Sequence, residues 1–553
     1  MQYKNVQMMV DICSRMGVEH AILSPGSRSA PLTVGFARHP QITTHVIPDE
    51  RTAGYIGLGL AQNTQKPVVL VCTSGTAAVN YAPAVIEAFY QHIPLIVMTA
   101  DRPPEWIDQG DGQTIHQEKL YGRHVKACVN MPVSSHDHID QKMIQTSLVD
   151  AISLALAPIQ GPVHINIPFR ETFYHELLEK SKEPVSRKAD VFENIINSNL
   201  NLELSAFQHS KILIIAGQNF HNVKLLEILS EINKKPNVVI IAECHSNLHE
   251  VEGVIAHHDL ILSGFKTNHY DELKPDILIT FGDAIISKAL KMVVRQWKVD
   301  YHWHLQESGV APDVFQSITE TIHCSTHDFF KLFKKEAENC TSEYSTQWHE
   351  FEDKAVSRIE SISLTELNEL TLTKFILNRL SDNSVLHVGN SMPIRWVNMA
   401  GVRGNIIIFS NRGTSGIDGV MSTAMGHAIV DKRIHTVLIG DMSFFYDRNA
   451  FWHNEIPANL RIIIFNNHGG GIFKIIDGPS QLPECDEYFV TEQTLTAENL
   501  AKDYKLIYIT ARSMAEFEDQ LSDFYKPSSK SKILEVETNI NSNKQVFEQL
   551  TKG

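Results

Sequence analysis

The chain has 553 residues, of which 43% are hydrophobic and 20% are charged. This composition is typical of a globular protein, and the length predicts about three domains. The formal net charge of −15 argues against a binding surface for nucleic acid or for an anionic membrane.

The N-terminal stretch 1–17 predicts an amphipathic helix, because polar and acidic residues interrupt its apolar positions. No stretch contains the roughly 18 to 20 consecutive apolar residues that a membrane span requires. The seven cysteines show no CxxC pair and no metal-ligand spacing. An odd number of cysteines without an export signal is typical of reduced thiols. We therefore expect a cytoplasmic protein without a membrane span.

Apolar runs that end in small or polar residues recur through the first third of the chain, at 21–27, 67–75, 93–101 and 161–169. Amphipathic stretches such as 49–62 separate them. Continuous runs of Val, Ile and Leu that alternate with helices are typical of parallel strands covered on both faces. The polar segment 181–201 that follows is expected to be a linker.

The same pattern returns twice. A second block has apolar runs at 211–219, 237–243, 253–259 and 276–283, and a polar, acidic stretch at 334–370 separates it from the third block. The third block has runs at 384–391, 405–413, 435–440, 461–467 and 532–539. We therefore expect an α/β protein with three doubly wound parallel-sheet domains, at 1–182, 183–345 and 346–553.

Polar residues follow two neighbouring runs of the third block. Asp441 comes directly after the run 435–440 and Asn467 ends the run 461–467, with a short helix expected between them at 447–455. Ligands of open parallel sheets gather at the carboxyl ends of the strands. Carboxylate and amide oxygens suit Mg²⁺, and Gly469 and Gly470 would let a backbone carbonyl approach the ion. Ser443 and the amides after Asp441 begin a helix whose N-terminus favours an anion.

This pattern predicts a clamp for a metal-bridged diphosphate. The alternative is that Asp441 merely caps a helix and the two amides merely form a turn, which is the commoner role of such isolated dipeptides. The spacing of the two ends and their strand context favour the clamp.

The sequence Gly-Asp-Met at 440–442 followed by Asn-Asn at 466–467 resembles the signature of the thiamin diphosphate (ThDP) enzymes. Their signature has glycine at the third position, which is not a ligand. A second Gly-Asp-Gly at 110–112 is not followed by Asn-Asn on a strand, so we expect it to be a loop.

The resemblance implies further cofactor contacts. Glu50 matches the acid that bonds the cofactor's pyrimidine ring, and Ile417 matches the bulky apolar residue beneath the bent cofactor. Alternatively, Glu50 is a first-turn residue that favours the helix dipole, and Ile417 is a core residue. The cofactor set that the resemblance implies is Glu50, Asn390, Ile417, Gly440, Asp441, Ser443, Asn467 and Gly469. The metal, Mg²⁺ or Mn²⁺, would be bound by Asp441, Asn467 and Gly469.

Longer motifs at 24–32, 49–61, 73–88, 99–117, 410–419 and 440–443 together resemble a narrower family, the MenD family of menaquinone biosynthesis. Its members are 2-succinyl-5-enolpyruvyl-6-hydroxy-3-cyclohexene-1-carboxylate (SEPHCHC) synthases. In the middle block the resemblance is limited to 282–288. It implies a transferase that decarboxylates 2-oxoglutarate on ThDP and adds the succinyl carbanion to isochorismate, with release of CO₂.

Both substrates carry carboxylates, which arginine captures in a bidentate manner. The substrate residues that the resemblance implies are Ser27, Arg28, Arg102, Gln113, Lys288, Ser391, Arg395 and Arg412. It places Ser391 and Arg395 on 2-oxoglutarate, whereas Arg28 and Arg102 would face isochorismate. A surface ion pair is the alternative for each arginine alone. Asp111 stands where family members have a small residue, which changes the local charge beside Gln113.

Three other functions are considered. A sister ThDP enzyme would keep Glu50, Asp441 and Asn467 but not the arginine set, and a regulator on an inactive ThDP fold would lose one of those three. A dinucleotide dehydrogenase is disfavoured, because no GxGxxG opens a helix after these runs. The resemblance also implies a homodimer or homotetramer with active sites at the subunit interface. The histidines, including His257 and His258, show no ligand pattern.

Overall fold

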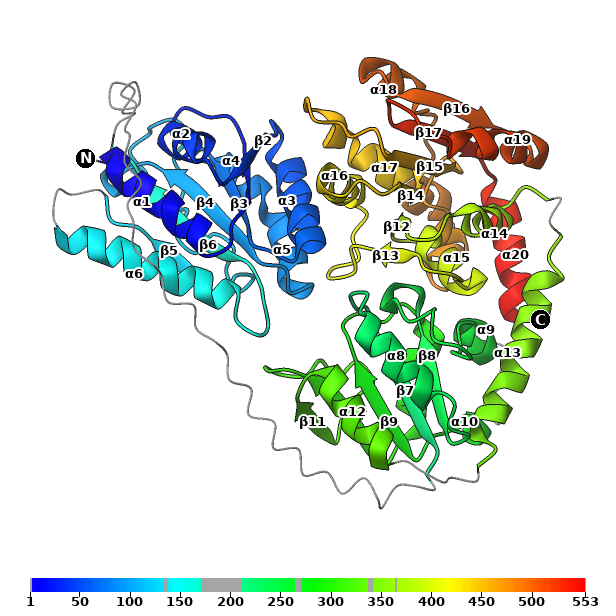
Figure 1. Ribbon diagram of the computed structural model, residues 1–553. Helices are drawn as coiled ribbons and strands as arrows, with labels where there is room; N and C mark the ends of the chain where they lie inside the picture. The colour runs from blue at the N-terminus through cyan, green and yellow to red at the C-terminus, as the bar shows by residue number, and fades with distance from the viewer. Residues whose placement is uncertain are drawn as a thin grey trace. The chain divides into compact units, whose positions relative to one another are not determined.

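The computed structural model describes residues 2–133, 138–170, 210–263, 270–336, 342–363 and 366–552. Their strands form three parallel sheets, with six, five and six strands in chain order (Figure 1). Each sheet is built from one of the three predicted blocks. The expected fold class of three parallel-sheet α/β domains is therefore confirmed.

The first sheet has the strand order β2-β1-β3-β4-β6-β5. Its strands are β1 (His20–Leu23), β2 (Thr43–Val46), β3 (Val68–Cys72), β4 (Leu95–Asp101), β5 (Cys128–Asn130) and β6 (Val163–Pro168). Helices α1 (Gln2–Arg15), α2 (Ala30–Arg38) and α6 (His138–Ala155) pack on one face, and α3 (Glu50–Thr64) and α5 (Ala82–Tyr90) lie on the other (Figure 1). Every residue of β3 and β4 is buried, because helices cover both faces.

The second sheet has the order β11-β10-β9-β7-β8. Its strands are β7 (Ile212–Ala216), β8 (Val238–Ala242), β9 (Ile277–Phe281), β10 (Tyr301–Gln306) and β11 (Glu320–His323). Helices α8 (Val223–Ile232) and α12 (Thr326–Glu336) cover one face. The other face packs against α9 (His258–Ser263), α11 (Lys288–Trp297) and α13 (Tyr344–Glu360).

The third sheet has the order β13-β12-β14-β15-β17-β16. Its strands are β12 (Val385–Val388), β13 (Ile407–Phe409), β14 (His435–Gly440), β15 (Leu460–Asn466), β16 (Ile507–Ala511) and β17 (Lys532–Glu537). The helices that follow or precede these strands are α14 (Glu369–Arg379), α15 (Met392–Ala400), α16 (Val420–Val430), α17 (Asp441–Tyr446), α18 (Glu498–Asp503), α19 (Met514–Phe524) and α20 (Ile540–Lys552).

The chain forms two compact units. The first comprises Met1–Asn194, Asn411–Lys432 and Phe445–Leu460, and the second comprises Ile195–Ser410, Arg433–Phe444 and Arg461–Gly553. The domain boundaries predicted from the sequence stay a prediction. The boundary at 182/183 lies outside the described residues, and the boundary at 345/346 falls in the first turn of α13.

Two glycines allow α3 and α16 to pack closely within the first unit. A Cβ atom at Gly59 would lie 2.1 Å from the carbonyl oxygen of Thr423, and one at Gly426 would lie 2.2 Å from that of Ile56. Each glycine therefore faces the backbone of the opposite helix, where no larger residue fits. The glycines of α3 and α16 thus bring the two helices into close contact.

The predicted run 253–259 is not a strand, which corrects the sequence analysis. Only Ile255 forms an isolated bridge, to Ile241, and α9 begins at His258. The backbone N–H groups of Ala256 and His257 donate to the Glu352 carboxylate, both at 3.1 Å, and are thus not available to a strand partner. The carboxylate of Glu352 therefore accepts the backbone hydrogen bonds that a neighbouring strand would otherwise accept.

Other elements were also predicted incompletely. Much of the polar stretch 334–370, expected only to separate two blocks, forms α13, which buries Tyr344, Trp348, Ala355 and Ile359. The predicted linker 181–201 lies outside the described residues. Residues 110–112 form an exposed loop, as predicted. None of the helices in the described ranges has the length and apolar character that a bilayer crossing requires.

Candidate functional site

Three predicted site residues follow neighbouring strands of the third sheet. Asn390 comes two residues after β12, Asp441 directly follows β14, and Asn467 directly follows β15. The sheet order places these carboxyl ends side by side. The space beside Gly440, the last residue of β14, is open, since a Cβ atom there would meet no described atom within 4 Å. The sheet thus places these predicted clamp residues at neighbouring strand ends, with open space beside Gly440.

Asp441 is the first residue of α17, and only 2% of it is exposed. Its Oδ2 accepts a hydrogen bond of 2.6 Å from Nε2 of Gln493. Burial raises the pKa of Asp441 to about 6, although the bond from Gln493 lowers it. A nearby cation would offset the cost of burying this carboxylate, as a metal ligand requires.

The two asparagines at the end of β15 differ in their surroundings. The side chain of Asn466 is fully engaged, because its Nδ2 donates to Oε1 of Glu535 at 2.7 Å and its Oδ1 accepts from Gln493. Nδ2 of Asn467 donates to Oε1 of Glu369 at 2.8 Å. Oδ1 of Asn467 is buried and has no hydrogen-bond partner among the described residues.

Buried acceptors in proteins are nearly always paired, so the unpaired Oδ1 of Asn467 calls for a ligand. An amide oxygen near a buried carboxylate is a donor set that Mg²⁺ accepts. The described residues contain no cluster of three or more His, Cys, Asp or Glu side chains placed for a metal. A cation here would therefore rely on Asp441, Asn467, backbone oxygens and groups outside the protein. The residues fit a divalent cation with a bound diphosphate.

The turn after Asn467 brings the backbone close to a second segment. His468 has a φ of 64°, and a Cβ atom at Gly469 would lie 2.8 Å from the carbonyl oxygen of Val490. Only glycine fits at position 469. The role of the Gly469 carbonyl as a metal ligand stays a prediction.

Glu50, the predicted activating acid, is the first residue of α3 in the first unit. Asp49 caps the helix, because its Oδ1 accepts from the N–H groups of Arg51 and Thr52 at 2.9 and 3.4 Å. The Glu50 carboxylate is therefore not needed as the cap. Burial, together with the charge of Asp49, raises the pKa of Glu50.

The segment around Ile417 belongs to the same unit as Glu50. Next to Ile417, Oδ2 of Asp418 accepts a hydrogen bond of 2.6 Å from the hydroxyl of Tyr55, one turn along α3 from Glu50. This bond fixes the position of the Ile417 loop against α3. The role of Ile417 beneath a cofactor stays a prediction.

The predicted substrate arginines share one feature. The Nε atoms of Arg28, Arg102 and Arg395 are buried and have no hydrogen-bond partner among the described residues. Nη1 of Arg28 donates to the backbone oxygens of Phe169 and Arg170 at 2.9 and 3.1 Å. These buried donors do not resemble an exposed ion pair, which was the alternative for each arginine.

Other predicted substrate residues lie on the surface of the first unit. Ser27 and Gln113 are exposed, and Gln113 has a φ of 57° and lies next to Gly75 at the end of β3. Arg412 is half-buried in the segment that leads to α16. These residues come from segments that follow β1 and β4 or from the 411–432 segment.

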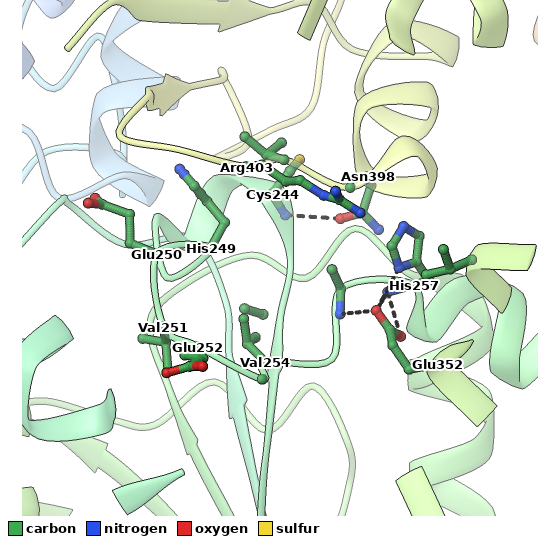
Figure 2. Close-up of a pocket in the computed structure, with 16 residues that line it drawn as sticks. Cys244, His249, Glu250, Val251, Glu252, Val254, His257, Glu352, Asn398 and Arg403 are labelled. Carbon is green, nitrogen blue, oxygen red and sulfur yellow. Dashed lines mark hydrogen bonds and ion pairs between the residues drawn. The ribbon is translucent and has the colours of Figure 1, made fainter. Parts of the chain in front are cut away.

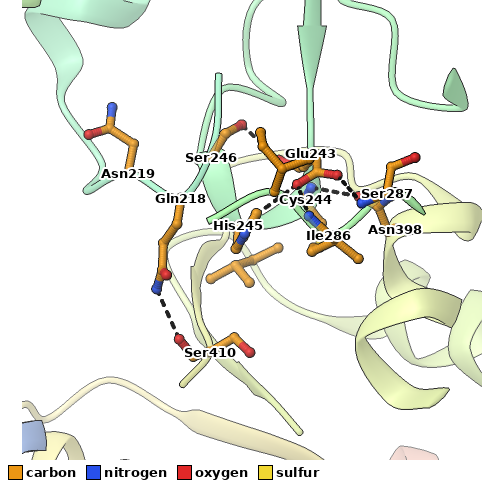
Figure 3. A network of polar contacts seen from close by, with 12 residues as sticks. Gln218, Asn219, Glu243, Cys244, His245, Ser246, Ile286, Ser287, Asn398 and Ser410 are labelled. Carbon is orange, nitrogen blue, oxygen red and sulfur yellow. Dashed lines mark hydrogen bonds and ion pairs between the residues drawn. The ribbon is translucent and has the colours of Figure 1, made fainter. Parts of the chain in front are cut away.

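In the second unit, Ser391 and Arg395 flank the start of α15. Ser391, the N-terminal flanking residue, has a φ of 72°. Burial lowers the pKa of Arg395, and the nearby charges of Asp259 and Glu243 oppose this effect. Glu243 also accepts from the N–H groups of Ile286 and Ser287 at 2.5 and 2.6 Å (Figure 3). The exposed Lys288 follows these residues at the start of α11, so Glu243 anchors the loop that presents it.

Comparisons with known proteins identify the family. Residues 4–120 match the model of the thiamine pyrophosphate enzyme N-terminal TPP binding domain, and residues 179–388 match the middle domain of thiamine pyrophosphate enzymes. A relative from Cytophaga hutchinsonii, named 2-succinyl-5-enolpyruvyl-6-hydroxy-3-cyclohexene-1-carboxylate synthase, is 41% identical over 98% of this chain and 97% of its own. The chain belongs to the SEPHCHC synthase family.

Two further relatives carry the same name. The protein from Flavobacterium johnsoniae is 38% identical over 99% of this chain and 98% of its own length. The protein from Porphyromonas gingivalis is 35% identical over 97% of this chain and 94% of its own length. The family resemblance stated from the sequence motifs is therefore confirmed.

A cavity of about 280 Å³ lies in the second unit of this member of the SEPHCHC synthase family (Figure 2). It is lined by the end of β8, the segment 249–257, α13 and α15, and it includes none of the predicted site residues. His257 Nδ1 and Glu352 Oε1 pair at 2.6 Å beside it, and Asn398 Oδ1 accepts from the N–H of Cys244 at 3.0 Å. The first pair joins the residue before α9 to α13, and the second joins the segment after β8 to α15. No chemistry was predicted for His257.

The sequence analysis missed three residues that contact or surround the predicted site. They are Gln493, which donates to Asp441; Glu369, which accepts from Asn467; and Glu243, which lies close to Arg395. Each is distant along the chain from the residue that it serves. An acid at the start of a helix, as Glu369 is in α14, is the one feature of the three that the sequence itself displays.

Proposed function

We propose that this chain is a SEPHCHC synthase that decarboxylates 2-oxoglutarate, adds the remaining succinyl unit to isochorismate and releases CO₂ in menaquinone biosynthesis. The observation that carries the proposal is the unpaired, buried Oδ1 of Asn467 near the buried Asp441, in a chain that aligns over nearly its whole length with SEPHCHC synthases. This geometry supports a metal-bound diphosphate.

The cofactors of the proposal are ThDP and Mg²⁺, with Mn²⁺ as a possible replacement. ThDP supplies the thiazolium carbon at which a 2-oxo acid loses CO₂. Asp441, Asn467 and the Gly469 carbonyl would hold the metal, and Asn390, Gly440 and Ser443 would lie along the diphosphate. Asp441 is the one anionic side chain of this set, so it would add the protein's negative charge to that of the diphosphate at the cation.

Glu50 would hold a proton at the pyrimidine ring. Its raised pKa supports this role, because such a carboxyl group is readily protonated. It can then donate its proton to a ring nitrogen and accept the proton again. Ile417 would fill the space beneath the cofactor. The Tyr55–Asp418 bond supports a fixed position for this apolar side chain.

The arginines would divide between the substrates. Arg395 and Ser391 follow β12, which ends beside the proposed diphosphate site, so we assign them to the distal carboxylate of 2-oxoglutarate. Arg28 and Arg102, with Ser27 and Gln113, belong to the unit of Glu50 and would bind isochorismate. Lys288 would be a further polar contact to the carboxylates of the substrates. We assign Arg412 to substrate binding but to neither of the two substrates in particular.

We also propose a cytoplasmic homodimer or homotetramer whose active sites lie at the subunit interface. Glu50 and Asp441 belong to different compact units, which is compatible with a site completed by two chains. The proposed domains are a pyrimidine-binding domain (1–182), a central domain (183–345) and a diphosphate-binding domain (346–553).

The test is release of CO₂ from 2-oxoglutarate by the purified protein with ThDP and Mg²⁺, measured with and without isochorismate. We expect CO₂ release that isochorismate accelerates, together with consumption of isochorismate. CO₂ release from pyruvate in preference to 2-oxoglutarate would instead indicate a sister ThDP enzyme.

A further inference from the structure

A buried carboxylate accepts a hydrogen bond from the side-chain nitrogen of the proposed metal ligand Asn467. Glu369, in the first turn of α14, is 1% exposed. Its Oε1 accepts from Nδ2 of Asn467 at 2.8 Å and from the hydroxyl of Thr538 at 3.1 Å. Its Oε2 accepts from Nε1 of Trp396 at 2.8 Å. Both oxygens of Glu369 are thus occupied by donors from other elements of the second unit.

This arrangement decides which way the Asn467 amide points. An amide has an acceptor oxygen and a donor nitrogen of nearly the same shape, so two orientations compete. Glu369 accepts at both of its oxygens, from Trp396 at Oε2 and from Thr538 at Oε1, so it selects the orientation in which Nδ2 faces Glu369. Oδ1 then faces away from Glu369, and this is the atom without a partner among the described residues. In the opposite orientation, an NH₂ group would face the cation and repel it.

We propose that Glu369 is a positioning residue that locks the Asn467 amide with its oxygen toward the divalent cation. The proposal rests on the proposed function, because it assumes that Asn467 is a metal ligand. Partners that orient metal ligands commonly change metal affinity 10- to 100-fold when they are mutated. Glu369 therefore contributes to cation affinity without contacting the cation.

The first variant is Glu369→Gln, which has the same shape but only one acceptor oxygen. Trp396 Nε1 can only donate, so it competes with Nδ2 of Asn467 for this single oxygen. Where Trp396 takes it, the new amide nitrogen faces Asn467 and turns the Asn467 oxygen away from the metal. We expect the apparent Kd for Mg²⁺, measured by calorimetric titration at saturating ThDP, to rise about 10- to 100-fold.

The rescue variant is Glu369→Gln combined with Trp396→Phe. Removal of the competing donor frees the glutamine oxygen to accept from Asn467, so the Kd for Mg²⁺ should return toward the wild-type value. The double variant also loses the hydrogen bond from Trp396, so it should unfold at a lower temperature. A merely structural role of Glu369 predicts the opposite, a further loss of affinity with the further loss of stability. Thr538→Val is the matched control, because it removes a donor from the same carboxylate oxygen but leaves Asn467 in place; its Kd for Mg²⁺ should not change.

If Glu369→Gln does not fold alone, the paired exchange Glu369→Gln with Asn467→Asp carries the test. In this exchange the new amide nitrogen at position 369 donates to the new carboxylate at position 467, and the new amide oxygen accepts from Trp396. The double variant should therefore bind Mg²⁺ more tightly than Asn467→Asp alone. The proposal is overturned if Glu369→Gln binds Mg²⁺ like the wild type, or if neither the rescue nor the exchange recovers affinity. Absence of Mg²⁺-dependent ThDP binding by the wild-type protein would refute the proposed cofactor site itself, and with it the role of Glu369.

Discussion

Ionisation of the buried Asp447 should lower the free energy of unfolding as the pH rises. The Asp447→Asn variant should not show this loss. Asp447 is 0% exposed, and its two oxygens accept from the N–H and the hydroxyl of Ser422 in α16, both at 2.7 Å. Burial raises the pKa of Asp447 to about 7, although the bonds from Ser422 and the charge of Arg51 lower it. An asparagine can keep both contacts, because its oxygen accepts from the N–H and its NH₂ donates to the hydroxyl.

The size of the effect follows from the difference between the folded and unfolded pKa values. The folded state binds the proton of Asp447 more tightly than the unfolded state, so stability falls as the pH rises from about 4 to about 7 and is level above that range. One pKa unit corresponds to 1.36 kcal/mol, so the full difference is about 4 kcal/mol and the part between pH 5 and pH 8.5 is about 3 kcal/mol. Asparagine does not titrate and loses none of this stability.

The assay is urea unfolding of the wild type and Asp447→Asn at pH 5 and pH 8.5, followed by circular dichroism. The free energy of unfolding of the variant should gain about 3 kcal/mol relative to the wild type between the two pH values. Asp519→Asn, at an exposed position of α19, serves as the control and should leave the pH profile unchanged. If the profiles of the wild type and Asp447→Asn stay parallel, Asp447 is ionised in the folded protein without cost, and the reasoning is wrong.

Three further predictions concern the proposed reaction. Glu50→Gln should keep ThDP and Mg²⁺ binding but lose 10²- to 10⁴-fold in turnover, whereas Asp441→Ala should chiefly weaken Mg²⁺ binding; near-normal turnover of Glu50→Gln would refute its role. Arg395→Ala should raise the KM for 2-oxoglutarate about tenfold to a hundredfold, because a charged hydrogen bond to its carboxylate, worth about 1.5 to 3 kcal/mol, is lost. Arg28→Ala and Arg102→Ala should raise the KM for isochorismate by a similar factor. Equal damage to both constants in all three variants would contradict this division. Mixed Glu50→Gln and Asp441→Ala chains should recover partial activity after subunit exchange, and no recovery despite exchange would indicate a site within one chain.

Strands of the sheet interiors were predictable because burial on both faces requires continuous apolar runs. The runs at 67–75 and 93–101 contain β3 and β4, and those at 435–440 and 461–467 contain β14 and β15. Some strands at or near a sheet edge, such as β10, were missed, although the edge strands β8 and β13 lie in predicted runs. The pattern of β10 mixes His302 and His304 with apolar residues, because Thr280 satisfies both rings inside the sheet, at 2.8 and 2.9 Å. A polar network of this kind leaves no apolar run in the sequence.

The candidate site was predictable where the chemistry lies in one short motif. Asp441 and Asn467 could be placed at neighbouring strand ends, because the run that precedes each of them is typical of a strand. The prediction of a single helix between them at 447–455 is wrong, since α17 and a 3-10 helix at Arg448–Phe451 lie there. Glu369 and Gln493 could not be found in this way. They reach the site from α14 and from the segment before α18, and only the packed structure shows that one accepts from Asn467 and the other donates to Asp441.

The central claim is that this chain transfers a four-carbon unit of 2-oxoglutarate to isochorismate. Incubation with [1-¹³C]2-oxoglutarate, isochorismate, ThDP and Mg²⁺, followed by mass spectrometry of the gas and of the product, tests it most directly. We expect the label to leave entirely as ¹³CO₂ and one unlabelled product to gain the remaining four carbons of 2-oxoglutarate. Label retained in the product, or unchanged isochorismate beside released ¹³CO₂, would contradict it.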